Sequence, residues 1–243
     1  MSSENHLKFS NSVVFMPLFV ILSIWTVFWV EIKFNINLNE FGIEPRSIKG
    51  LRGVLFSPFI HGSVEHLYNN TIPLATLTAA IFYFYNKDAG KVLFFGVLFS
   101  GLLTWFIGRP SYHIGASGVI YVLVSFIFFK GIFARHYRLI ALSLAMVFLY
   151  GSMIWYIFPI KEGISWEGHL SGFLVGLILA LVFKTKLEID KRYSWERDDY
   201  NEEEDEFLKY FDEDGNFIES VDPPINEVKI NYHFKEKKDR EEG

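Results

Sequence analysis

The sequence contains no cysteine, which excludes both a disulfide framework and a thiolate metal site. Charge is also scarce over most of the chain. Asp, Glu, Lys and Arg make up 21% of the residues, and most of them gather in a few short stretches and in the C-terminal segment 185–243. A soluble domain of this length spreads its charged residues through every segment. Because hydrophobic residues reach 51%, with 26 Phe, this segregation of charge is typical of a membrane protein with a polar tail.

An excess of basic residues is missing as well. The formal net charge is −5 and comes largely from the tail, so the sequence predicts no nucleic-acid partner. The N-terminus, MSSENHLKFSNS, lacks the charged-then-apolar layout and the small-residue cleavage site of a signal peptide. We therefore expect the first apolar run to be retained as a membrane anchor.

Long runs free of Asp, Glu, Lys and Arg fill most of the chain. Each is close to the ~20 residues that cross ~30 Å of hydrocarbon as a helix. Backbone groups in lipid must be paired within their own segment, which favours helices over strands. The six runs are 13–30, 67–85, 92–108, 114–129, 139–160 and 168–183.

These runs predict an all-α fold, a polytopic bundle of six transmembrane helices over residues 13–184. A short cytoplasmic segment, 1–12, precedes the bundle. An acidic cytoplasmic tail, 185–243, follows it, and we expect the tail to be partly disordered or to form a small hairpin with an Asp-Gly turn in KYFDEDGNFIES.

The loops between the runs differ in charge. Basic residues cluster near 87–91, 130–138 and 184–186, whereas the two short loops on the opposite side carry one basic residue each, Arg109 and Lys161. By the positive-inside rule, the basic side and both termini face the cytoplasm.

Polar side chains stand at the starts of three of these helices, where burial in lipid makes them costly. His66 and Asn70 begin the second helix, Ser117 begins the fourth and His169 begins the sixth. All three helix starts face the outer side, at a similar shallow depth. The spacing of four residues puts His66 and Asn70 on one face of their helix.

Glycines accompany two of these polar residues. Gly115 precedes Ser117, and Gly172 and Gly176 follow His169. The last two glycines form a small-xxx-small stripe, which lets membrane helices approach closely. If this stripe packs against the fourth helix, His169 meets Ser117.

A serine in contact with a histidine is a recognised nucleophile and general base. Tyr121 lies on the same helix face as Ser117 and could hold the imidazole of His169 by packing. The backbone N–H of Ser117 is unpaired at a helix N-terminus, and with Asn70 and His66 it could form an oxyanion hole. Taken singly, each of these residues more often has a packing role, so the argument depends on their joint placement.

Three motifs carry these residues: HGSVEHLYNN at 61–70, GASG at 115–118 with Tyr121, and GHLSGFLVG at 168–176. In this order and at these helix starts, they resemble the motifs of the rhomboid family of intramembrane serine proteases, of the bacterial six-helix type. The resemblance covers the six-helix region and leaves out the acidic tail.

The resemblance implies an endopeptidase that cleaves membrane-anchored proteins in or next to their transmembrane helix, and a location in the bacterial inner (plasma) membrane with the active site open to the outer side. It implies transmembrane protein substrates and the lipid bilayer as partners, with no cofactor and no metal. It also implies roles for individual residues: Ser117 as nucleophile, His169 as general base, an oxyanion hole of Asn70, His66 and the Ser117 amide, and support from Gly115, Tyr121 and Gly172.

The long first loop, 31–66, mixes basic and large apolar residues, and we expect it to lie in the membrane interface. Arg52 corresponds to the arginine of the family's Trp-Arg pair. Leu51 stands where the tryptophan is expected, so the packing of this loop departs from the family pattern.

Other functions fit the sequence less well. A metalloprotease would need His61, Glu65 and His66, but H-x-x-x-E-H is one residue longer than the H-x-x-E-H pattern. A transporter is disfavoured because no helix carries a charged residue midway through the bilayer. The main alternative is a non-catalytic rhomboid-like factor that binds transmembrane helices for sorting or degradation. The paired Ser117 and His169 favour the enzyme, because a binding protein needs neither.

Overall fold

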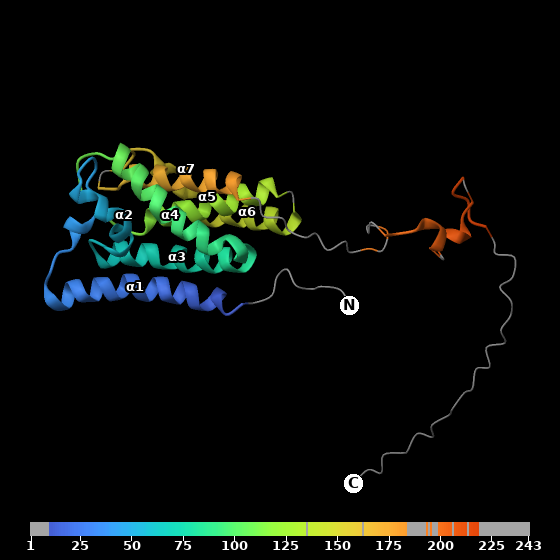
Figure 1. Ribbon diagram of the computed structural model, residues 1–243, viewed down its shortest axis with the longest axis horizontal. Coiled ribbons are helices and arrows are strands. Elements are labelled where there is room, and N and C mark those ends of the chain that lie inside the picture. The colour runs from blue at the N-terminus through green and yellow to red at the C-terminus, as the bar shows by residue number, and fades with distance from the viewer. Residues whose placement is uncertain are drawn as a thin grey trace, which may run out of the picture. The chain divides into compact units, whose positions relative to one another are not determined.

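The computed structural model describes residues 10–134, 136–161, 163–183, 193, 195, 199–205, 207–212 and 214–218. Within these residues the prediction of an all-α fold is confirmed, and β-structure is limited to two isolated bridges, Ile43–His113 and Phe211–Phe217. The helices, shown in Figure 1, are α1 (Ser12–Phe34), α2 (Gly53–Phe56), α3 (Val64–Phe84), α4 (Asn86–Ile107), α5 (Ser117–Phe133), α6 (Tyr137–Tyr150) and α7 (Trp166–Val182). Short 3-10 helices are η1 (Asn39–Phe41), η2 (Lys49–Arg52), η3 (Ser57–Phe59), η4 (Gly151–Ile157), η6 (Glu202–Glu204) and η7 (Leu208–Tyr210).

The chain divides into two compact units, Met1–Glu188 and Ile189–Gly243. In the second unit, the bridge between Phe211 and Phe217 encloses a turn in which Gly215 has φ +80°. This turn lies at the Asp-Gly pair noted in the sequence. Residues 1–9 and 219–243 lie outside the described residues, so the predicted segment boundaries at both ends stay predictions.

Three helices of the described chain are long and apolar enough to cross a membrane: α1, α4 and α6 with its continuation η4. The helices α5 and α7 are apolar but have only 17 residues each, and α3 carries Glu65, His66 and Asn70 among its 21 residues. Large hydrophobic side chains cover the outside of the first unit; Phe148, for example, is 88% exposed. Such a surface is typical of a helical bundle in a membrane. The count of six spans stays a prediction.

The core of the first unit is built around α5. This helix packs against α3, α4, α6 and α7, and its contact with α7 is the most extensive (Figure 1). Because it is surrounded by neighbours, α5 buries residues on all its faces, from Val119 to Gly131. Whatever stands at its first turn is therefore held in a fixed position.

The glycines of α7 set its distance from α5. A Cβ at Gly172 would lie 2.2 Å from the Gly118 carbonyl oxygen, and one at Gly176 would lie 2.4 Å from that of Val122. Real side chains do not approach backbone this closely, so these positions require glycine. The small-xxx-small stripe of the sequence thus packs against the fourth apolar run, as expected.

The first loop is folded into short helices that dock beside α4. Trp105 Nε1 donates to the Ser47 carbonyl over 2.8 Å, and Arg46 donates to the Gly108 carbonyl over 3.0 Å. The bridge between Ile43 and His113 ties the same loop to the segment that precedes Ser117. The loop therefore supports the nucleophile's segment from one side.

Candidate active site

Ser117 and His169 meet at the ends of the two central helices. Ser117 is the first residue of α5, and His169 lies in the first turn of α7. The Ser117 hydroxyl and His169 Nε2 are 2.9 Å apart, which is hydrogen-bond distance. His169 is 8% exposed and Ser117 is half-buried. The packing of α7 on α5 through glycine brings these side chains together across 52 positions of sequence.

The second ring nitrogen of His169 fixes which nitrogen carries the proton. Nδ1 lies 3.0 Å from the backbone carbonyl oxygen of Tyr156, in η4. A carbonyl can only accept a hydrogen bond, so in the neutral ring Nδ1–H donates to Tyr156 and Nε2 is left as an acceptor for the Ser117 hydroxyl. A backbone carbonyl therefore does the orienting that a carboxylate does in a triad.

Tyr121 holds the imidazole from its face. Its ring stacks on that of His169 with centroids 4.3 Å apart and an interplanar angle of 15°. Its hydroxyl donates to the Met153 carbonyl over 2.6 Å. Because Met153 and Tyr156 both belong to η4, this 3-10 segment is tied to the tyrosine on α5 and to the histidine on α7.

His66 and Asn70 approach the nucleophile from α3. The ring of His66 lies so close to Gly115 that a Cβ there would be 2.6 Å from it, and Gly115 has φ +106°, a conformation that favours glycine. Asn70 is 4% exposed and its Nδ2 donates to the His66 carbonyl over 2.8 Å. That nitrogen carries a second hydrogen, which remains for a ligand.

The start of α5 lacks a side-chain cap. The first N–H groups of a helix have no partner within it, so the Ser117 amide is a donor at the mouth of the site. One residue earlier, the Ala116 N–H donates to His61 Nε2 over 3.4 Å, while His61 Nδ1 donates to the Phe59 carbonyl over 3.3 Å. His61 is 2% exposed and anchors the turn that presents Ser117.

These residues line a cavity of about 770 Å³. Its wall includes Ser117 and His169 together with His66, Asn70 and Tyr121. This volume lies within the range of ~300–1,000 Å³ that is usual for ligand-binding pockets. The cavity is large enough to admit a short stretch of extended chain at the serine.

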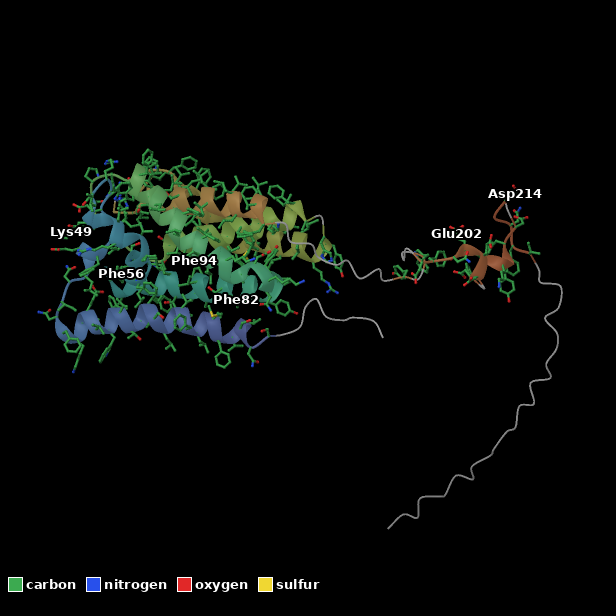
Figure 2. The ribbon with its side chains drawn as sticks, viewed as in Figure 1. Lys49, Phe56, Phe82, Phe94, Glu202 and Asp214 are labelled. Atoms are coloured by element: carbon green, nitrogen blue, oxygen red, sulfur yellow. The ribbon has the colours of Figure 1, made fainter. Side chains whose placement is uncertain are left out.

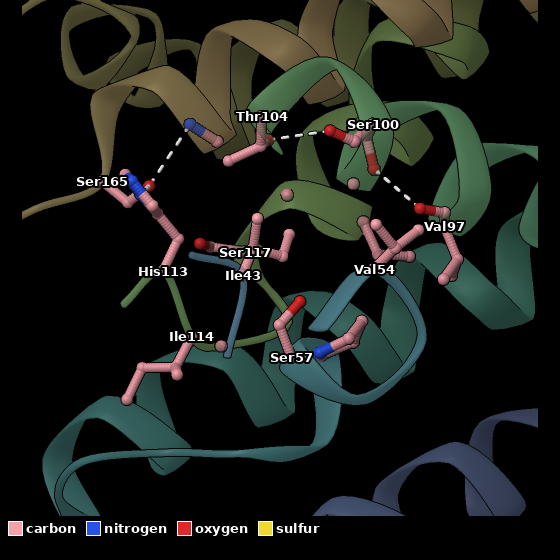
Figure 3. Close-up of a pocket in the computed structure, with 16 residues that line it drawn as sticks. Ile43, Val54, Ser57, Val97, Ser100, Thr104, His113, Ile114, Ser117 and Ser165 are labelled. Carbon is pink, nitrogen blue, oxygen red and sulfur yellow. Dashed lines mark hydrogen bonds between the residues drawn. The ribbon is translucent and has the colours of Figure 1, made fainter. Parts of the chain in front are cut away.

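A second, small cavity of about 40 Å³ lies beside Ser117, shown in Figure 3. Much of its lining is polar, with Ser57, Ser100, Thr104 and His113 among its residues. A water needs roughly 10–15 Å³ of such volume and a few polar partners. The space therefore suits water molecules held next to the nucleophile.

Comparison with known proteins identifies the family. The profile of the Rhomboid domain matches residues 49–186, more than half of the chain. The chain belongs to the rhomboid family. The match covers α2 to α7 and all the site residues above, and it leaves out α1 and the acidic tail.

Relatives of this rhomboid occur in mycobacteria. A protein from Mycobacterium tuberculosis and one from Mycobacterium bovis are each 37% identical over 158 residues, which cover 59% of this chain and 64% of the relative. A protein from Mycobacterium leprae is 33% identical over 158 residues, or 61% of its own length. All three are described as uncharacterized. The match thus spans less than two thirds of these relatives.

The rhomboid site includes a network that sequence reasoning missed. His113 Nδ1 contacts the hydroxyl of Ser165, and His113 Nε2 donates to the Arg109 carbonyl over 3.1 Å. Glu167 is 1% exposed, and its carboxylate accepts from the Arg109 backbone N–H over 3.2 Å. The same carboxylate lies 3.7 Å from the guanidinium of Arg109. That guanidinium also donates to the Ile164 carbonyl. Burial lowers the pKa of His113, while its bond to Arg109 and the nearby Glu167 act in the opposite direction. The network joins the loop before Ser117 to the loop before His169.

Two features could have suggested this network. Ser165 caps α7 by accepting from the Gly168 N–H over 3.3 Å, and a serine three residues before the GH pair is a helix-start signal. His113 stands only four residues before Ser117. The carbonyl of Tyr156 gives no sequence signal at all, because every residue has a carbonyl.

The rival zinc site of His61, Glu65 and His66 finds no geometric support. The rings of His61 and His66 meet edge to face with centroids 5.0 Å apart. Among the described residues, no group of three or more His, Cys, Asp or Glu side chains converges as metal ligands would. His61 instead uses both its ring nitrogens on backbone groups.

The burial of His61 predicts an acid-sensitive fold. Burial, and next the nearby His66, lower its pKa from 6.5 to about 4. The unfolded chain therefore takes up this proton first, so the stability due to neutral His61 is full above pH 6.5 and is lost as pH falls towards 4. The difference between these two pKa values, 6.5 − 4 = 2.5, corresponds to about 3 kcal/mol of the free energy of unfolding. We expect the thermal midpoint of the detergent-purified protein to fall over this range.

The His61→Gln variant is the control for this prediction, because glutamine can accept from the Ala116 N–H without titrating. Its midpoint should be lower than that of the parent at neutral pH but should change less between pH 6.5 and 4. Equal pH slopes for the two proteins would assign the acid sensitivity to another group.

Proposed function

We propose that this rhomboid is an intramembrane serine endopeptidase that cleaves membrane-anchored substrates in or next to their transmembrane helix. The observation that carries the proposal is the hydrogen bond of 2.9 Å between Ser117 and His169, in a ring tautomer that leaves Nε2 free to accept. Rhomboids as a family act on transmembrane substrates in the bilayer, which supports the same substrate class here.

The reaction follows from this geometry. As the Ser117 Oγ attacks the scissile carbonyl carbon, its proton passes to His169 Nε2 and the carbonyl oxygen becomes an oxyanion. When the tetrahedral intermediate collapses, the C–N bond breaks and Nε2 returns the proton to the leaving amine. A water then attacks the acyl-enzyme and its proton passes to Nε2. The C–Oγ bond breaks as Nε2 returns that proton to Oγ, which releases the acid and restores the Ser117 hydroxyl and the neutral imidazole. The Tyr156 carbonyl stabilises the imidazolium at both stages by accepting from Nδ1–H.

The oxyanion is assigned to three donors: the Ser117 amide, the Asn70 side chain and His66. All three residues line the large cavity, and the Ser117 amide at the uncapped start of α5 has no partner within its helix, so it is available to donate to the oxyanion. Such donors are fixed before reaction and cost no reorganisation when the charge develops. The small cavity beside Ser117 is the candidate source of the hydrolytic water.

This assignment predicts a specific effect of Asn70→Ala. Loss of one oxyanion donor should lower kcat by about 10²–10³-fold, because that donor acts mainly on the transition state, and KM should stay within about twofold. The measurement is steady-state cleavage of a purified single-span substrate. Asn69→Ala is the matched control, because Asn69 is the exposed neighbour of Asn70 in the sequence and lines the same cavity. Equal kcat for the two variants would remove Asn70 from the oxyanion hole.

The proposed placement in the membrane uses six spans, with both termini in the cytoplasm of a bacterial cell and the site open to the outer side. The 17 residues of α5 and of α7 extend only ~25 Å at ~1.5 Å per residue. A helix shorter than the ~30 Å hydrocarbon layer can begin below the surface. The first residues of α5 and of α7, which include Ser117 and His169, then lie inside the membrane in a hydrated cavity.

The alternative is a non-catalytic rhomboid that binds transmembrane helices. Reaction with a serine-directed fluorophosphonate separates the two, because the probe needs an activated hydroxyl and no knowledge of the substrate. We expect the purified protein to be labelled at Ser117 and to cleave a generic single-span substrate. A protein that binds such a helix but is neither labelled nor able to cleave would belong to the alternative.

A further inference from the structure

A second serine–histidine pair lies beside Ser117 and His169. His113 Nδ1 and the hydroxyl of Ser165 are 2.5 Å apart, and both residues are labelled in Figure 3 together with Ser117. His113 precedes Ser117 by four residues, and Ser165 precedes His169 by four residues, so the same two segments are joined twice. The large and the small cavity share four lining residues, which are His113, Ile114, Ser117 and Ser165. The second pair therefore stands at the site itself, beside the candidate nucleophile.

The partners of His113 fix the direction of its bond to Ser165. His113 Nε2 lies 3.1 Å from the backbone carbonyl of Arg109, which can only accept, so in the neutral ring Nε2–H donates and Nδ1 is an acceptor. Burial lowers the pKa of His113, which favours the neutral ring. The Ser165 hydroxyl therefore donates to Nδ1. Its oxygen is left to accept from the Gly168 N–H over 3.3 Å, a bond that caps the start of α7.

The role of this pair differs from that of Ser117 and His169. The Ser165 oxygen caps α7, and an attack through that oxygen would release the start of the helix that carries His169. The start of α5, where Ser117 lies, has no side-chain cap. The second pair is thus suited to holding two segments together rather than to attacking a substrate.

His113 is itself held by the first loop, whose Phe56 is labelled in Figure 2. Ile43 and His113 exchange two backbone hydrogen bonds, each over 2.9 Å. Because His113 is also only 4% exposed, its imidazole is a fixed point to which the hydroxyl of Ser165 is attached. The Ser165 carbonyl accepts from the His169 N–H over 3.2 Å, so the attachment extends to the candidate general base.

The direct bond between Ser117 and His169 is lost at one stage of the proposed reaction. In the acyl-enzyme the Ser117 oxygen belongs to an ester and has no hydrogen to donate to Nε2. The stack on Tyr121 still limits tilting of the imidazole, but a stacked ring can slide in its own plane. The bond between His113 and Ser165 is directional and does not depend on the state of the Ser117 oxygen.

We propose that His113 and Ser165 are positioning residues that hold His169 in place while water attacks the acyl-enzyme, an inference that rests on the proposed function. In this step His169 Nε2 takes a proton from the water and returns it to the Ser117 oxygen, so it must stay within hydrogen-bond reach of both. A misplacement of ~1 Å can slow such a step by up to ~100-fold. In acylation the Ser117 hydroxyl itself holds the imidazole, so loss of the second pair should slow deacylation and leave acylation nearly unchanged.

The test separates the two steps with a small activated ester, the p-nitrophenyl ester of N-acetylalanine, added to the full-length protein in detergent. Its good leaving group makes acylation fast, so p-nitrophenolate should appear in a burst followed by a slower steady release. The rate of the burst measures acylation, and the steady rate measures deacylation. Ser165→Ala should lower the steady rate about tenfold and keep the burst rate within about twofold of the parent.

Conservative variants at both positions are the matched controls, and the thermal midpoint of each protein is recorded. Ser165→Thr keeps the hydroxyl and should keep the parent steady rate. Leucine and asparagine are similar in size, but only asparagine offers an acceptor to the Ser165 hydroxyl. His113→Leu should therefore lower the steady rate about tenfold, and His113→Asn by less than about threefold. The double variant of Ser165→Ala and His113→Leu should be no slower than the slower single variant, because both remove the same bond.

Four results would overturn the proposal. A burst rate and a steady rate that fall by the same factor would mean that the pair only supports the fold. An unchanged steady rate in both Ser165→Ala and His113→Leu would remove the positioning role and leave the proposed function intact. A parent protein without a burst that depends on Ser117 would remove the proposed function, and this role with it. Phosphonate labelling of Ser165 in the Ser117→Ala protein would make Ser165 a nucleophile instead.

Discussion

Ser117→Ala should lower the rate of cleavage of a single-span substrate by a factor on the order of 10⁴–10⁶, because removal of a serine nucleophile of this kind leaves only binding and oxyanion stabilisation. The substitution removes one oxygen, whose hydrogen bond is to His169, so the fold should survive. The measurement is the initial rate in detergent, with the thermal midpoint of each protein recorded alongside. Fluorophosphonate labelling should disappear in the same variant.

Ser111→Ala is the control for this experiment. Ser111 is exposed and lines the same large cavity, but it lies on the loop before α5 and has no contact with His169. Its cleavage rate should stay within about twofold of that of the parent. Cleavage by Ser117→Ala at the parent rate would end the assignment of Ser117 as nucleophile.

His169→Gln should be almost as inactive as Ser117→Ala, because an unassisted serine hydroxyl is a weak nucleophile at neutral pH. Glutamine keeps much of the volume that packs against Tyr121, so the variant should lose the base without emptying the site. The rate of fluorophosphonate labelling should also fall by orders of magnitude, although Ser117 is still present. Labelling at the parent rate would show that the hydroxyl is not activated by this imidazole.

The double variant adds an independent check. When two groups act as a unit, removing both costs about as much as removing one. The Ser117→Ala, His169→Gln protein should therefore retain the same residual rate as either single variant. A further fall of several orders of magnitude in the double variant would mean that the two residues act separately.

The fold was predicted well where it depends on local pattern. Long apolar runs separated by charged loops predict helices, and the structure has helices at all six of them. The ends were less predictable: the fifth run, expected as one helix over 139–160, becomes α6 followed by the 3-10 segment η4. The change begins at Gly151, and a hydropathy pattern does not distinguish an α-helix from a tighter one.

The contact of Ser117 with His169 was predicted through the glycines. The spacing of Gly172 and Gly176 indicated a close helix pair, and the structure has the approach at Gly118 and Val122 that this stripe requires. Sequence reasoning therefore identified the partners without knowing their distance. The catalytic roles of these residues remain proposals.

Other parts of the site could not be predicted. The tautomer of His169 depends on the Tyr156 carbonyl, and the turn before Ser117 depends on His61. The contact between the loop before Ser117 and the loop before His169 depends on Glu167 and Arg109. These contacts join segments up to 58 positions apart, and their existence depends on packing rather than on any local spacing.

The sequence by itself determined that the chain is helical and apolar, and it determined which side chains are available to react, because these follow from composition and from the spacing of residues along one helix. The tertiary structure alone decided that the hydroxyl of Ser117 and Nε2 of His169 lie within hydrogen-bond distance and that Nδ1 is held by a backbone carbonyl. The physical reason is that close packing of α5 on α7 sets positions to a fraction of an ångström, whereas a sequence pattern specifies only the face on which a residue lies.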